Sequence, residues 1–145
     1  MHMPNFNDAK VTSVYVNATG AVADIQDDAP NASTPGGAFD VTLEMVAGTG
    51  LSGAYNLVTT CIDLTTSTVA PASLRPGTPL NGTTDTFGST ANWKSPSPLY
   101  NTFNHTDSVS PPAGAAGHVY QYTAALFTSN GQIVSIKQSD PFILL

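Results

Sequence analysis

The sequence predicts an all-β fold, an antiparallel β-sandwich of two packed sheets, with a small β-barrel as the alternative. Short runs of β-branched and aromatic residues alternate with polar ones, and glycine and proline interrupt them throughout. No stretch shows the period and end caps of a helix. We therefore expect a single domain over residues 1–145, in which residues 1–9 form a flexible tail or tag.

The strongest local signal is a β-hairpin in residues 118–138. Asn130-Gly131 separates two alternating runs, and this pair favours a two-residue turn that places Phe127 opposite Val134. The turn sorts the side chains into two faces. The face expected to form the core holds Val119, Thr123, Ala125, Phe127, Val134 and Ile136. The face interpreted as half-buried or as a contact surface holds His118, Tyr120, Tyr122, Leu126, Ile133, Ser135 and Lys137.

The remaining strands are shorter or less regular. They are expected at residues 11–16, 21–25, 38–46, 54–64, 65–69, 83–87, 99–103 and 142–144. In the run 38–46, one alternating set is apolar and is expected in the core: Phe39, Val41, Leu43 and Met45. Outside its two short strands, the segment 71–117 is rich in proline and glycine and is interpreted as a long loop.

The end of the hairpin carries a family resemblance. Ser139-Asp140-Pro141-Phe142, which closes the hairpin, resembles the final strands of bacterial-type immunoglobulin-like and fibronectin-like β-sandwich modules. The similarity covers the last quarter of the chain, which lacks the paired cysteines and core tryptophan spacing of true immunoglobulin domains. It implies an immunoglobulin-like sandwich of the kind found in extracellular modules.

Composition limits the classes of partner. Charged residues make up 10% of the chain, against about 25% in average domains. The net charge of −6 has the wrong sign for nucleic acid, and no apolar run is long enough for a membrane span. Few lysines, many Ser/Thr residues and the acidic balance favour an extracellular or cell-surface location, with Met1-His2-Met3 as the remnant of a tag or removed leader. The single cysteine, Cys61, is expected to be buried.

Two groups of residues are candidates for binding. Aromatic rings beside amides suit sugar or protein recognition, and the candidate ligand-binding residues are Trp93, Tyr100, Asn101, His105, Tyr120 and Tyr122. Hard cations prefer several oxygen ligands from a turn, so calcium is a possible cofactor at an acidic cluster formed by Asp24, Asp27 and Asp28. A solvated acidic turn is the simpler interpretation of that cluster.

We interpret the chain as a non-catalytic, secreted binding module that recognises carbohydrate or protein through the loops of residues 71–117. The first alternative is a structural protein that forms homodimers or larger homo-oligomers through the hairpin face. The second alternative is a small enzyme with a pocket at the end of the sandwich or barrel.

Overall fold

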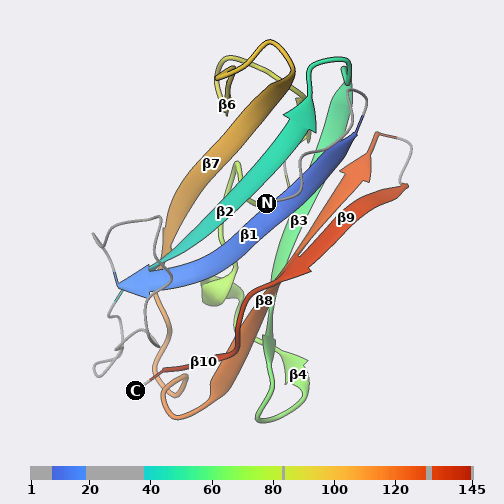
Figure 1. The fold of residues 1–145 in the computed structure, drawn as a ribbon. Helices are drawn as coiled ribbons and strands as arrows, with labels where there is room; N and C mark the ends of the chain where they lie inside the picture. Colours follow the sequence, from blue (N-terminus) through green and yellow to red (C-terminus); the bar gives the residue numbers. More distant parts are fainter. Residues whose placement is uncertain (1–7, 19–37, 83, 130–131, 145) are drawn as a thin grey trace.

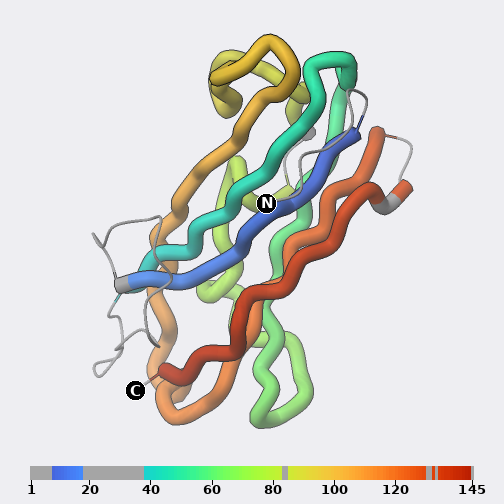
Figure 2. The backbone as a smooth tube through the Cα atoms, viewed as in Figure 1, coloured from blue at the N-terminus to red at the C-terminus, as the bar shows by residue number. Residues whose placement is uncertain are grey.

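The computed structural model describes residues 8–18, 38–82, 84–129 and 132–144. In these residues two antiparallel sheets stack face to face (Figures 1 and 2). The four-stranded sheet contains, in spatial order, β1 (Ala9–Ala18), β2 (Phe39–Gly48), β7 (Tyr100–Val109) and β6 (Trp93–Lys94). The six-stranded sheet contains β3 (Ala54–Asp63), β4 (Thr68–Val69), β5 (Thr84–Thr86), β8 (Val119–Thr128), β9 (Ile133–Gln138) and β10 (Phe142–Ile143).

The predicted sandwich is confirmed, and the alternative of a closed barrel is wrong for the described residues. In the six-stranded sheet, β8 and β3 pair at the centre, β9 and β10 both pair with β8, and β4 and β5 both pair with β3. No backbone ladder joins β1 to β9 where the edges of the two sheets meet. The one helical element in the described ranges is the short 3₁₀ turn Ala72–Leu74, and none of their helices has the length and apolarity needed to cross a membrane.

Strand β2 confirms the alternation expected from its sequence. Phe39, Val41, Leu43 and Met45 are at most 1% exposed and form the centre of the core with residues of β3 and β8. Thr42 lies in the other alternating set but is also buried, and its hydroxyl shares a 2.8 Å hydrogen bond with Thr106 on β7. The apolar period of two therefore identifies the inward side of this strand correctly.

The register predicted for the hairpin is confirmed over most of its length. Thr123 pairs with Gln138 and Leu126 with Ser135, as a two-residue turn at Asn130-Gly131 requires. The turn residues themselves lie outside the described part of the chain. Close to the turn a β-bulge shifts the pairing by one residue, so that Phe127 lies opposite Ile133. The bulge also lets Val134 pack against the core, where it was expected.

The faces assigned to the hairpin, in contrast, were wrong. Tyr120, Tyr122 and Leu126 are at most 1% exposed and point into the core, whereas Ile136 is 56% exposed. Because Tyr120 and Tyr122 carry hydroxyl groups, they were expected on the partly solvent-exposed face of the hairpin. Inside the sandwich these groups find acceptors, because Tyr120 donates to the Ala115 carbonyl oxygen at 2.9 Å and Tyr122 to that of Leu74 at 2.6 Å.

Strand β7 extends well beyond the segment 99–103 predicted from the sequence. All ten of its residues, Tyr100–Val109, pair with β2, although its second half is the polar run Asn104 to Ser108. Pairing with a long neighbouring strand thus overrides weak local propensity. The predicted strand at 21–25 lies outside the described residues, and of the predicted tail only Asp8 and Ala9 are described, with Ala9 already paired to Ala47.

The corrected face assignment can be tested by truncating one side chain on each face. We expect Leu126→Ala to lower the free energy of unfolding by about 2 to 5 kcal/mol, because it opens a cavity in the core. Ile136→Ala is expected to cost less than about 1 kcal/mol. Urea unfolding of dilute protein measures both values, and a larger loss for Ile136→Ala would contradict the assignment.

Candidate functional site

The structure separates the predicted ligand-binding residues into two groups. Tyr120 and Tyr122 lie in the core and offer no surface to a ligand, which corrects their prediction as a contact row. Trp93 and His105 line one pocket, while Tyr100 and Asn101 lie at the beginning of β7 outside that lining. The predicted calcium ligands Asp24, Asp27 and Asp28 lie outside the described residues. Among the described residues, no cluster of three or more His, Cys, Asp or Glu side chains could hold a metal ion.

The pocket lies where the very short strand β6 ends and β7 continues, and we call it the β6–β7 pocket. Its volume is about 300 Å³, at the lower end of the range for small-molecule sites. Its lining combines hydroxyls, amides, one ammonium group, one imidazole and one indole, from Thr90, Ala91, Asn92, Trp93, Lys94, Thr102, Asn104 and His105. None of these lining residues carries a carboxylate.

A hydrogen-bond network that is buried at Trp93 and Tyr55 and partly buried at Asp85 holds the floor of the pocket. The Trp93 indole N–H donates to the Tyr55 hydroxyl at 3.1 Å, and that hydroxyl donates to Asp85 at 3.3 Å. The same Asp85 oxygen accepts from Ser89 at 3.1 Å and from the Asn92 amide at 2.6 Å. One carboxylate therefore connects β3, β5 and the loop that leads into β6.

The protonation states of this network follow from its contacts. Burial raises the pKa of Asp85, but hydrogen bonds from Asn92, the Thr86 backbone, Ser89 and Tyr55 outweigh it, so the pKa lies below its usual value. Burial also raises the pKa of Tyr55 above its usual range. Near neutral pH the carboxylate is thus ionised and the phenol is neutral, as their hydrogen bond requires.

His105 is oriented from two sides. Its Nε2 lies 2.8 Å from the Asn92 carbonyl oxygen, and because a carbonyl can only accept, this nitrogen carries the proton. Its ring packs on Phe103, with 4.5 Å between the centroids. In the neutral ring, Nδ1 is therefore the nitrogen that can accept a hydrogen bond.

Trp93 does not offer a ring face to the pocket. The indole is 5% exposed and contacts Tyr55, Phe87 and Phe103, with ring centroids 5.4 to 5.9 Å apart. Phe103 is buried as well, with 1% of its surface exposed. Stacking of a sugar on this indole is excluded in this conformation, so polar side chains must supply the recognition.

Asn101 has a structural position beside the pocket. Its side-chain oxygen accepts from the Ser95 hydroxyl at 2.6 Å, and its amide nitrogen lies where a Cβ on Gly88 would come within 2.8 Å of it. Gly88 also has φ +74°, a conformation that other residues rarely adopt. Asn101 and Gly88 thus fix the path of the loop between β5 and β6.

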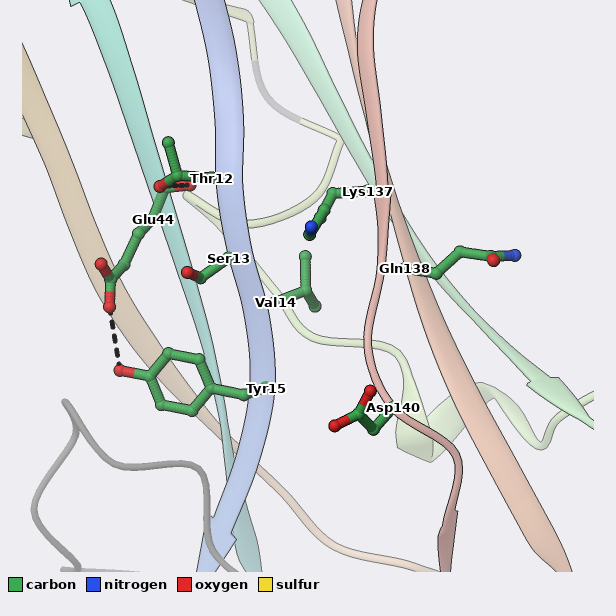
Figure 3. A pocket seen from close by; sticks show the side chains of 8 residues that line it. All are labelled: Thr12, Ser13, Val14, Tyr15, Glu44, Lys137, Gln138 and Asp140. Atoms are coloured by element: carbon green, nitrogen blue, oxygen red, sulfur yellow. Dashed lines mark hydrogen bonds between the residues drawn. The ribbon is translucent and has the colours of Figure 1, made fainter. Parts of the chain in front are cut away.

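A second depression lies between the facing edges of the two sheets, and we call it the β1–β9 groove. It has a volume of about 480 Å³ and is lined by Thr12, Ser13, Val14, Tyr15, Glu44, Lys137, Gln138 and Asp140. In Figure 3 the Lys137 ammonium and the Asp140 carboxylate extend from the β9 side toward β1, and the Tyr15 hydroxyl donates to Glu44 at 3.1 Å on the far side of β1. Sequence reasoning did not single out this groove, because its residues come from distant strands.

The end of the sandwich at which β3 ends and β8 begins carries an Asp–His pair, Asp63 and His118. His118 Nδ1 donates to Asp63 at 2.7 Å, and the other carboxylate oxygen of Asp63 accepts from the backbone N–H groups of Thr65 and Thr66. The hydrogen bond from His118 is the main reason that the pKa of Asp63 lies below its usual value. Among the described residues no hydroxyl or thiol is hydrogen-bonded to the other ring nitrogen of His118. The pair connects the turn after β3 to the beginning of β8.

Cys61 faces the core on β3, as expected. It is 4% exposed, and burial is the main factor that raises the pKa of its thiol to about 12. The thiol therefore stays protonated at neutral pH and is a packing residue.

Comparison with known proteins shows a distant structural similarity. No family model matches the chain, and no curated protein matches it. Among solved structures it is similar to one described as "Crystal structure of putative beta-galactosidase from bacteroides fragilis", with a TM-score of 0.49 and 12% sequence identity. The match covers 92% of this chain but only 17% of that chain.

The role of the network of Trp93, Tyr55 and Asp85 can be tested at Tyr55. We expect Tyr55→Phe to lower the free energy of unfolding by about 1 to 3 kcal/mol, because it leaves the Trp93 N–H without its acceptor. Urea unfolding followed by tryptophan fluorescence gives the value, since Trp93 is the only tryptophan. An unchanged stability would show that the Tyr55 hydroxyl does not support the pocket floor.

The Asp–His pair predicts a specific loss of stability in acid. The lowered pKa of Asp63 stabilises the fold above the ordinary carboxyl pKa of about 4, and this contribution is lost as the pH falls through the folded-state pKa. We expect His118→Ala to make the decline in stability below about pH 4 less steep. Urea unfolding at a series of pH values measures the slope. His105→Ala, whose ring bonds to a carbonyl, serves as the control and should keep the wild-type slope.

Proposed function

We propose that this chain is a non-catalytic, extracytoplasmic binding module of the immunoglobulin-like type, and that the β6–β7 pocket is its ligand site. The observation that supports this site is the pocket itself: hydrogen-bonding side chains line a cavity whose floor is held by the network of Trp93, Tyr55 and Asp85. Such preorganisation lowers the entropic cost of binding.

The strand order supports the immunoglobulin-like part of the proposal. In an immunoglobulin sandwich, strands A, B, E and D form one sheet and strands C, F and G the other. Here β1, β2, β7 and β6 follow each other in the four-stranded sheet, and β3, β8 and β9 in the six-stranded sheet. Taking these seven strands in chain order as A to G reproduces both sheets, with β4 and β5 as additions beside β3 and with β10 as an addition beside β8.

A local feature at the beginning of β8 gives independent support. Immunoglobulin domains often carry a tyrosine near the beginning of strand F whose hydroxyl bonds to the backbone a few residues upstream. Tyr120 is the second residue of β8, and its hydroxyl donates to the Ala115 carbonyl oxygen. Two residues later, where antibody domains have a cysteine, this chain has the buried Tyr122.

The chemistry of the pocket favours a saccharide as the ligand. Hydroxyls and amides from Thr90, Thr102 and Asn104 can pair with sugar hydroxyls, and Lys94 and His105 add the titratable groups of the lining. A cavity of about 300 Å³ suits one or two sugar units. The β1–β9 groove is less suitable as a site for a charged ligand. Lys137 carries a positive charge and Glu44 and Asp140 carry negative charges along the groove, so either sign of ligand charge meets a like charge.

Binding can be measured through the single tryptophan. We expect a glycan array to identify a saccharide that changes Trp93 fluorescence on titration, because the indole forms part of the pocket. Lys94→Ala combined with Asn104→Ala should weaken binding by about tenfold or more, since two polar partners are lost.

Ser108→Ala provides the matched control. Ser108 is exposed on the same strand as Asn104 but does not line the pocket, so its replacement should leave the affinity unchanged. Equal affinities for the double variant and the control would contradict the assignment of the site, and the absence of any array ligand would contradict a saccharide-binding role.

A further inference from the structure

The exposed apolar side chains of this protein are not scattered. Of the large hydrophobic residues exposed in the described ranges, Val58, Val69 and Ile136 belong to β3, β4 and β9, and Leu64 directly follows β3. Leu99 is the one exposed large hydrophobic residue of the described segments that lies elsewhere, before β7 of the other sheet. The exposed fractions of Val69 and Ile136 are 70% and 56%. Exposed hydrophobic residues that gather on one face indicate an interaction surface.

The register of the six-stranded sheet makes a continuous row of these side chains. Val58 pairs with Ala125, and Ala125 pairs with Ile136, so the three lie side by side across β3, β8 and β9. Leu57 and Thr59 flank Val58, Ala124 and Leu126 flank Ala125, and all four are buried, which places Val58 and Ala125 on the outer face of the sheet. Ile136 lies in the same row by its pairing with Ala125 and is 56% exposed. The next row, formed by Thr60, Thr123 and Gln138, is uncharged as well.

The distribution of charge separates the two outer faces. The outward-facing residues of β3, β8 and β9 include no charged side chain in the described ranges. The outer face of the four-stranded sheet, in contrast, carries Asp40 and Glu44. A chain with a net charge of −6 repels its own copies wherever acidic surfaces meet. The outer face of the six-stranded sheet is where two copies can approach without opposing like charges.

Edge-to-edge pairing of the strands is the other common way for sheets to associate, and the structure opposes it. A β-bulge between Val11 and Ser13 interrupts the regular edge of β1, and Lys137 places a charge on the edge strand β9. Both features protect edges from pairing with another chain. The face is therefore the better contact surface.

We propose that the outer face of the six-stranded sheet binds a second copy of this chain in a two-fold symmetric dimer. The row Val58–Ala125–Ile136 meets the same row of the partner, as an isologous interface requires. Packing of two such faces about 10 Å apart buries the apolar row and needs no charged partner. The β6–β7 pockets belong to the other sheet and remain open in such a dimer.

Sedimentation equilibrium of the full chain tests the proposal. We expect twice the chain mass at concentrations approaching about 100 μM, with dissociation on dilution. Ile136→Lys should give a monomer over the same range, because it places a cation opposite its own copy in a buried row. Leu99→Lys is the matched control: Leu99 is 67% exposed, lies outside the face, and its replacement should leave the dimer intact.

A second variant guards against misfolding of Ile136→Lys. Val58→Thr with Ile136→Thr keeps β-branched residues on both strands and should raise the dissociation constant about tenfold or more. A monomeric wild-type chain at about 100 μM would overturn the proposal. So would a dimer that both the threonine and the lysine variants leave unchanged.

Discussion

The structure depends on the burial of tyrosine hydroxyls that all find partners inside the sandwich. Tyr55 bonds to Asp85, Tyr120 to the Ala115 carbonyl and Tyr122 to the Leu74 carbonyl. A buried hydroxyl without a partner would cost about 1 to 3 kcal/mol, so these rings can point inward only because β5, the 3₁₀ turn and the loop before β8 present acceptors. Since side chains alternate along a strand, the inward tyrosines oblige the other set of β8 residues to face outward.

That constraint explains how the sequence could predict the pairing of the hairpin but not its orientation. The period of two and the Asn-Gly turn determine which residues of β8 and β9 lie opposite each other, and both are local signals. Which face is buried depends on acceptors more remote in sequence: Leu74 is far from Tyr122 along the chain. In β2 the local signal was sufficient, because its apolar and polar residues alternate cleanly and the inward set needs no hydrogen-bond partner.

The same limit applies to the candidate site. Trp93 and His105 could be singled out because aromatic rings beside amides are visible in the sequence, and the structure places both at one pocket. Asp85 could not be recognised in this way. Its importance arises from four partners brought together by β3, β5 and the following loop, and an isolated aspartate in a threonine-rich run gives no such signal. Likewise, the polar second half of β7 looks like a loop until its ladder to β2 is seen.

The two surfaces proposed here are connected by the inward tyrosines. Had the tyrosine row faced outward, the outer face of the six-stranded sheet would carry hydroxyls, and the apolar row at Val58, Ala125 and Ile136 would lie in the core. With the tyrosines inside, this apolar row is left on the outer face of a chain in which 10% of the residues are charged. A dimer formed through that row buries the row and presents two β6–β7 pockets, one on each copy of the chain. Two linked sites raise the apparent affinity for a repetitive ligand without any new contact, which suits a module whose small pocket can make only a few hydrogen bonds.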